Sequence, residues 1–171
     1  RYALGAGLIG LGRVAVPPLA DAAMPVLREL EDAFHETANL AVLDGDLVLY
    51  VAQVPSRQRM RMFTEVGRRV LPHSTGVGKA MLSAMAEPHV RSLVARTGLP
   101  SFTPSTLTDP GAFVADLRAS RHRGFAVDDS EQEVGVRCIA VVVPGLPSPT
   151  AVSISGPAAR ITDAIVPEVV E

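Results

Sequence analysis

Apolar residues between positions 17 and 34 recur every three or four residues, which is the spacing of one face of an α-helix. The series consists of Leu19, Ala23, Val26, Leu27, Leu30, Ala33 and Phe34. Pro18 suits the first turn of such a helix, whereas Pro25 should kink it or divide it in two, because proline removes a backbone hydrogen bond. The pattern predicts an amphipathic helix that is disturbed near its middle.

Two strand-like runs follow at 37–43 and 47–54, and they are joined by Asp44-Gly45-Asp46. A glycine between short acidic residues is typical of the turn of a β-hairpin. We therefore expect these two runs to pair as antiparallel strands.

The run 57–66 alternates strictly, which predicts a half-buried strand with its methionines facing inward. Its arginines are Arg57, Arg59 and Arg61, and the opposite face carries Gln58, Met60 and Met62. The arginine row is compatible with a phosphate-binding stripe, but a solvated or subunit-facing surface suits the acidic chain better. The methionines fit the wall of an adaptable pocket, and they fit ordinary core packing equally well.

Residues 72–82 begin with small, polar and flexible residues and turn apolar at helical spacing from Val77 onward. Thr75 or Ser74 can cap the first free amide groups, and Gly76 and Gly78 allow the backbone to approach a ligand closely. The N-terminus of a helix attracts anions through its unpaired N–H groups and its dipole. We expect this stretch to form one wall of a ligand site.

The rest of the chain alternates between helical and extended patterns. Helices are predicted at 87–97, from Asp109 to about Gly124, and at 157–170; strands are predicted at 125–127, 136–143 and 151–155. The acidic segment 128–133 has the character of a solvated turn. One antiparallel sheet flanked by helices makes this an α+β domain.

Composition narrows the possible functions. The chain has 171 residues and a formal net charge of −2, whereas domains that grip phosphate backbones usually carry a clear positive excess. No apolar run approaches the ~18 residues of a membrane span, so we expect no membrane partner. A single cysteine fits a reducing, cytoplasmic setting. Because it lacks an initiator methionine, the chain is expected to be part of a longer protein.

Motifs of enzymes and metal sites fail on their spacing. Gly78-Lys79 is followed by alanine, so it is no Walker A loop, and a GxSxG nucleophile elbow does not occur. The glycines at 5–10 match a dinucleotide fingerprint but lack a preceding strand. The four histidines show no metal-binding spacing, and Cys138 sits in an apolar run that should bury it and raise its pKa. We therefore predict no catalytic residue, no metal and no cofactor.

The last two predicted strands bring polar atoms to one face of the sheet. Alternation places Val136, Cys138 and Ala140 on one face of the first strand, and Ser153 and Ser155 on one face of its partner. Each serine on its own could simply bond a neighbouring backbone group. Together with the start of the helix at 76, they indicate a small, mostly apolar cavity with a few polar contacts, as in small-molecule pockets.

A series of ordered motifs resembles the effector-binding domain of IclR-type transcriptional regulators along nearly the whole chain. The motifs are Tyr2-x-Leu4-Gly5 with Leu11-Gly12, Glu36-Thr37, Leu71-Pro72-His73-Ser74-Thr75-Gly76-Val77-Gly78-Lys79-Ala80, Thr103-Pro104-x-Thr106-Leu107-Thr108, Arg121-x-x-Gly124-Phe125-Ala126-x-Asp128, Glu133-x-Gly135-Val136-x-Cys138-Ile139-Ala140 and Ser153-Ile154-Ser155-Gly156-Pro157. The resemblance implies a GAF-like sensor domain at 17–171, preceded at 1–16 by the tail of a DNA-binding wing and a linker helix. It also implies that DNA is bound through an N-terminal winged-helix domain absent from this chain, and that the protein forms a homo-oligomer, a dimer or a tetramer.

The same resemblance implies a small carboxylate or aromatic acid as the effector and a set of residues that contact it. These are the backbone at Gly76 and Val77, apolar walls from Met60, Met62, Val70 and Val136, and polar atoms of Asp128, Cys138, Ser153 and Ser155. Asp128 would repel a carboxylate unless it points away, meets a ligand hydroxyl or is protonated by its surroundings. Two alternatives stay open at this point: a small-molecule-transforming enzyme, and an oligomerisation or interaction module with an unused pocket.

Overall fold

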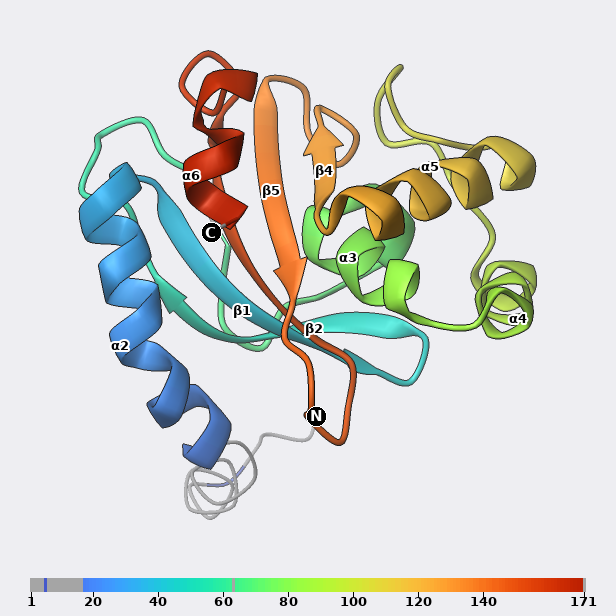
Figure 1. Cartoon of the computed structure of the whole chain (residues 1–171), viewed down its shortest axis with the longest axis horizontal. Helices are drawn as coiled ribbons and strands as arrows, with labels where there is room; N and C mark the ends of the chain where they lie inside the picture. The colour runs from blue at the N-terminus through green and yellow to red at the C-terminus, as the bar shows by residue number, and fades with distance from the viewer. Residues whose placement is uncertain (1–4, 6–16, 63, 171) are drawn as a thin grey trace.

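The computed structural model describes residue 5, residues 17–62 and residues 64–170 (Figure 1). The expected wing tail and linker helix, and the glycine fingerprint at 5–10, lie outside these residues apart from Gly5. Helices in the described part of the chain are all too short or too polar to cross a membrane.

A six-stranded antiparallel sheet forms the centre of the domain, with the strand order β3-β2-β1-β6-β5-β4. The strands are β1 (Thr37–Asp44), β2 (Leu47–Val54), β3 (Arg69–Val70), β4 (Ala126–Asp129), β5 (Val136–Val142) and β6 (Thr150–Pro157). The predicted hairpin joins β1 to β2, and Gly45 takes the positive φ of 63° that its tight turn requires. The predicted α+β class, with one antiparallel sheet, is confirmed.

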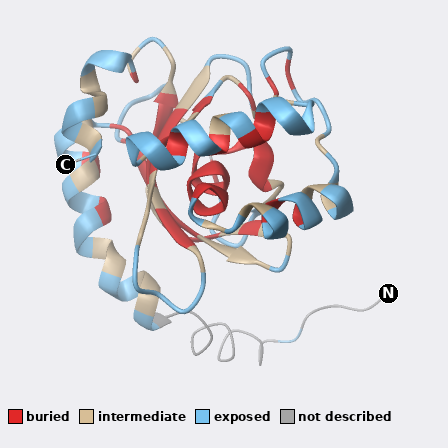
Figure 2. Ribbon diagram, turned by 45° about the vertical axis from the view of Figure 1, so that its right-hand side comes forward, coloured by how far each residue is buried: buried red, intermediate tan, exposed pale blue. Residues whose placement is uncertain are grey.

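Helices cover both faces of this sheet (Figure 1). They are α2 (Pro17–Phe34), α3 (Gly76–Ala84), α4 (Glu87–Thr97), α5 (Pro110–Arg123) and α6 (Val166–Val170). One face packs against α2 and α6, and its core is centred on Leu27, Leu40 and Ile154. The other face packs against α3, which is buried almost throughout between the sheet and α4 and α5 (Figure 2).

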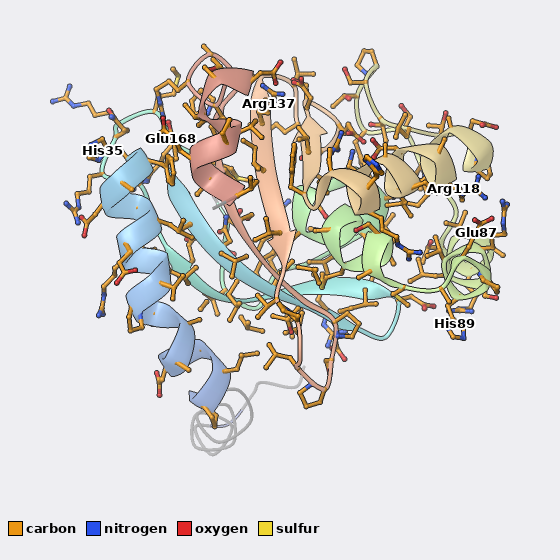
Figure 3. The ribbon with its side chains drawn as sticks, in the orientation of Figure 1. His35, Glu87, His89, Arg118, Arg137 and Glu168 are labelled. Atoms are coloured by element: carbon orange, nitrogen blue, oxygen red, sulfur yellow. The ribbon has the colours of Figure 1, made fainter. Side chains whose placement is uncertain are left out.

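Local sequence signals explain where the outer helices begin and end. Asp109 caps α5 by accepting a hydrogen bond from the Ala112 amide at 2.7 Å, and Gly124 ends the helix in the left-handed conformation. At the start of α4, Glu87 forms an ion pair with Arg118 of α5 at 2.6 Å, and Figure 3 shows the two side chains together. These contacts set α4 and α5 as an outer layer over α3.

Three sequence predictions are wrong in detail. Of the two outcomes predicted for Pro25, division of the first helix is wrong, since α2 runs unbroken from Pro17 to Phe34, and the kink stays a prediction. The C-terminal residues 157–170 are not one helix, because β6 continues through Pro157 and a turn separates it from the 3-10 turn Asp163–Ile165 and the short α6.

The run 57–66 is not a strand in its described residues, 57–62 and 64–66. After β2 the chain leaves the sheet, and the short β3 at Arg69–Val70 takes the place beside β2 instead. Residues 57–61 are all exposed, and Arg57 turns back to α2, where it contacts Glu31 and Asp32. An ion pair with the helix end thus takes the place of the expected strand pairing.

Candidate functional site

Buried polar side chains gather on the sheet face that α3 covers. Ser153 and Ser155 lie on β6, and Asn39 lies opposite Ser153 on the neighbouring β1. The Asn39 amide nitrogen, Nδ2, lies 3.4 Å from each serine hydroxyl oxygen. All three residues are at most 3% exposed. The two serines are therefore part of a shared polar cluster.

Cys138 adds a thiol to this cluster. It lies on β5 opposite Ser155, is buried, and has its pKa raised to about 11, chiefly because burial disfavours the thiolate. The Ser153 and Ser155 hydroxyls and the Gly76 backbone amide act in the opposite direction and stabilise the thiolate slightly. The prediction of a buried cysteine with a raised pKa is confirmed, and at neutral pH the group is a thiol.

The side-chain amides of Asn39 and Gln53 also belong to the cluster, although neither residue was predicted from the sequence as a site residue. Gln53 on β2 donates a hydrogen bond from Nε2 to the Asn39 side-chain oxygen, Oδ1, at 2.9 Å. A usable signal was present, because both amides interrupt otherwise apolar strands at positions that face the same side as Ser153. A buried side-chain amide requires hydrogen-bond partners, and here Asn39 and Gln53 bond to each other.

Helix α3 begins beside the cluster, as predicted. The Thr75 hydroxyl oxygen accepts a hydrogen bond from the Gly78 amide at 3.2 Å, so Thr75 is the cap. The two glycines serve close packing within the protein: a Cβ atom on Gly76 would lie 2.7 Å from the Cys138 sulfur, and one on Gly78 would overlap the backbone of Pro72. The absence of a side chain at Gly76 lets the first turn of α3 lie directly on β5, and its absence at Gly78 lets the helix pack against the backbone of Pro72.

Asp128 lies at the far end of the cluster, on β4 opposite Cys138. Its Oδ1 atom accepts hydrogen bonds from the Glu131 amide at 2.7 Å and the Gln132 amide at 3.3 Å. Burial nevertheless raises the pKa of this carboxyl to about 7, and the nearby Glu131 carboxylate adds to the effect. Asp128 is therefore partly protonated near neutral pH, which reduces its repulsion of an anion.

The acidic segment 128–133 is not the solvated turn that its composition predicts. Glu131 is 6% exposed, and its carboxylate accepts a hydrogen bond from the Lys79 ammonium at 2.5 Å. The same ammonium lies 3.1 Å from an Asp116 oxygen. Lys79, the only lysine of the chain, is 1% exposed. A buried cation on α3 thus draws the acidic segment into the protein, a partnership that the sequence spacing did not reveal.

The residues that were predicted to form apolar walls of the site differ in how far they are buried. Val77 is fully buried and packs with Cys138, while the half-buried Val70 packs against that same core. Val136, at the start of β5, is half-buried. Met62 is half-buried beside β1, and its carbonyl oxygen accepts a hydrogen bond from the Thr37 hydroxyl at 3.3 Å.

Met60 is the exception among these walls. It is 69% exposed, so the prediction that it faces inward is wrong. Its side chain is exposed because this part of the chain is a loop, and its backbone carbonyl accepts a hydrogen bond from Arg160 at 2.8 Å.

The chemistry of the cluster is that of binding. Its donors are neutral amides, hydroxyls and the first amides of α3, and the Lys79 charge is already matched by Glu131 and Asp116. Across the described ranges, no three histidine, cysteine or acidic side chains come close enough to hold a metal ion. Such an arrangement can hold a small polar molecule by hydrogen bonds.

Comparison with known proteins gives one consistent result. Residues 13–171 match the family described as bacterial transcriptional regulator IclR, C-terminal. The chain is 40% identical over 148 residues to the HTH-type transcriptional regulator BhcR of Paracoccus denitrificans, a match that covers 85% of this chain and 53% of BhcR. The chain spans about half the length of the curated relatives it matches.

Solved structures show the same similarity. The IclR protein of Thermotoga maritima superimposes with a TM-score of 0.87 at 31% identity, over 99% of this chain and 70% of that one. The inducer-binding domain of the transcription factor PobR from Acinetobacter, a double mutant in complex with 3-hydroxybenzoic acid, superimposes with a TM-score of 0.78 at 28% identity. That match covers 88% of this chain and 89% of the PobR domain.

Proposed function

The chain belongs to the IclR family of bacterial transcriptional regulators, and from this premise we propose that its polar cluster binds a small carboxylate or aromatic acid as the effector. Its homologues are transcriptional regulators and not enzymes. The observation that carries the proposal is the group of buried hydroxyl, amide and thiol side chains beside the N-terminus of α3. A PobR inducer-binding domain of the same fold holds 3-hydroxybenzoic acid, which supports this class of ligand.

Several residues are proposed to contact the effector. Amides at the start of α3, at Gly76 and Val77, would meet its carboxylate, because a helix N-terminus favours negative charge. Ser153 and Ser155 would hydrogen-bond its oxygens, and Asp128 would meet a hydroxyl or remain protonated. Val77, Val70, Met62 and Val136 would form the apolar surroundings.

Control of transcription is a proposal about the longer protein. The effector would bind one arrangement of subunits better than another, since a ligand shifts an equilibrium only through its differential affinity for the two states. A homo-oligomer would carry this change to an N-terminal winged-helix domain outside this chain, which would bind DNA in the bacterial cytoplasm. The negative net charge of the present chain agrees with DNA being bound by a different domain.

A screen of small organic acids by thermal shift and calorimetry tests the binding proposal. We expect 3-hydroxybenzoate, benzoate or another acid of the panel to stabilise the protein, and the double variant Ser153→Ala, Ser155→Ala to lose most of that stabilisation. Ser105→Ala with Ser148→Ala, which alters two exposed serines, is the matched control. Full affinity in the Ser153/Ser155 variant would show that the effector binds elsewhere. If no acid binds and the protein still oligomerises, an interaction module becomes the better description.

A further inference from the structure

Asn39 is a buried hydrogen-bond donor whose bonds are all long. Its side-chain nitrogen carries two N–H groups, and three oxygens compete for them: the hydroxyls of Ser153 and Ser155 at 3.4 Å and the Thr37 carbonyl at 3.5 Å. The usual N–H···O distance is about 2.9 to 3.0 Å, so each contact lies near the outer limit of a hydrogen bond. This donor is therefore available to a better acceptor.

Gln53 determines which way the Asn39 amide faces. The Gln53 nitrogen can only donate, and it lies 2.9 Å from the side-chain oxygen of Asn39. With Gln53 in this orientation, the oxygen of Asn39 faces β2 and its nitrogen faces the serines of β6. The orientation of an amide is fixed by its hydrogen-bond network in this way, and one strong bond outweighs three long ones.

The surroundings of Asn39 call for an acceptor on the ligand. Gly76 at the start of α3 contacts Cys138, and Cys138 lies opposite Ser155, so the helix amides and the Asn39 amide border one cluster. The only lysine of the chain is already paired with Glu131 and Asp116. The donors that a ligand would contact beside Asn39 are consequently mainly neutral N–H groups.

We infer that the Asn39 side-chain nitrogen donates a hydrogen bond to an oxygen of the bound acid, and that Gln53 is a positioning residue that keeps this nitrogen turned toward it. The inference rests on the proposed function and adds to it a prediction of which acids bind best. Acids whose second oxygen accepts a hydrogen bond should bind better than those that present a donor or a methyl group at that point.

The first test needs no ligand and uses the side-chain amide signals of Asn39 in ¹H–¹⁵N spectra. In Gln53→Glu the new carboxylate only accepts, so the Asn39 nitrogen should turn toward β2 and its signals should shift strongly. Gln58→Glu, which makes the same change at an exposed position, should leave them in place. Unmoved Asn39 signals in Gln53→Glu would overturn the positioning role, whether or not an acid binds.

The second test is a double-mutant cycle with 3-hydroxybenzoate, benzoate and the acid panel as probes. We expect Asn39→Ala to weaken binding at least tenfold and Gln53→Met about fivefold, while Gln53→Met added to Asn39→Ala has no further effect. Gln58→Met is the neutral control, and thermal unfolding of each unliganded variant checks its fold.

The outcomes separate the two proposals. Independent, additive losses would overturn the positioning role of Gln53, and full affinity in Asn39→Ala would overturn the role of Asn39. If the wild type binds no acid while Gln53→Glu turns the Asn39 amide, the proposed function fails, and the selection of acids by Asn39 fails with it. If the wild type binds and the amide does not turn, only the inference fails.

Discussion

Two loops next to the polar cluster are held in opposite ways. The segment 128–133, which comprises the end of β4 and the loop after it, is tied down from three sides. Lys79 pairs with Glu131, Ser74 donates a hydrogen bond to Gln132 at 2.6 Å, and Thr106 donates one to the Glu131 carbonyl at 2.6 Å. The segment 56–62, after β2, begins at the buried Ser56, whose hydroxyl donates to the His35 carbonyl at 2.6 Å, and continues with five exposed residues at 57–61. These five are held by the Arg57 ion pairs and by the Met60 carbonyl.

The difference shows which side of the cluster is fixed and which is free to adjust. Burying charges in pairs makes the 128–133 segment costly to move, because any displacement leaves an unpaired charge in the interior. The ion pair between Arg57 and the exposed Asp32 is worth little and is screened by salt, so the exposed residues 57–61 can shift at smaller cost. If the cluster binds an effector as proposed, we expect residues 57–61 to adjust more readily than the 128–133 segment.

The largest expected effect comes from breaking the buried pair. Lys79→Met leaves the Glu131 and Asp116 carboxylates without their cation, and removal of one partner of a buried pair costs about 3 to 5 kcal/mol. Urea unfolding should show this loss, and Lys79→Met with Glu131→Met should recover part of it. A loss below about 1 kcal/mol would mean that the two loops are equally loosely held.

Asp128 should make stability depend on pH. Its pKa of about 7 in the folded protein lies above the unfolded value of about 3.9, so the folded state holds the extra proton between these values. Stability should therefore fall as the pH rises from about 4 to 7, by up to about 4 kcal/mol for this group, and then level off. Asp128→Asn should flatten the profile, whereas Asp129→Asn, at an exposed neighbour, should not. Urea unfolding across this pH range measures both, and an unchanged slope in Asp128→Asn would contradict the assignment.

The hydroxyl of Thr106 offers a smaller test of the same segment. It donates to the Glu131 carbonyl and accepts from the amides of Phe102 and Thr103 at 3.1 and 2.9 Å. Thr106→Val keeps the shape but leaves these groups unpaired, which should cost about 1 to 3 kcal/mol. Thr108→Val, at an exposed position, provides the control, with thermal unfolding as the measurement. Equal losses in the two variants would show that the Thr106 network is unimportant.

Removal of the surface ion pairs should have the smallest effect. Arg57→Ala loses the contact to the exposed Asp32, and an exposed pair contributes roughly 0 to 1 kcal/mol. The buried Glu31 carboxylate loses the Arg57 side chain as well, but it keeps the hydrogen bond that the Arg57 backbone amide donates at 3.2 Å. The loss should shrink further at high salt. Limited trypsin digestion should cut the wild-type chain first within 57–61. A loss as large as that of Lys79→Met would remove the contrast between the loops.

Local signals predicted the elements that depend on local chemistry. Asp109 and Gly124 mark the ends of α5, and Gly45 marks the hairpin, because caps and tight turns need particular side chains or backbone angles. The serines on β6 were placed correctly on one face by simple alternation.

Predictions that depended on a distant partner failed. Alternation in 57–66 resembled a strand, but Arg57 found its partner on α2. The acidic segment resembled a solvated turn until Lys79, 52 positions away from Glu131, was brought against it. Asn39 and Gln53 stand out in the sequence as amides within apolar strands, but their bond to each other becomes visible only when the strands are paired.

The contact between Gly76 and Cys138 makes the thiol a natural reporter of breathing motions. Because α3 begins directly on the sulfur, there is no room for an added group while the helix is seated. A maleimide or iodoacetamide would react only during moments when the helix lifts from β5 and the thiol ionises. Labelling rates with and without a bound acid would thus read the opening of this layer directly, without any engineered probe.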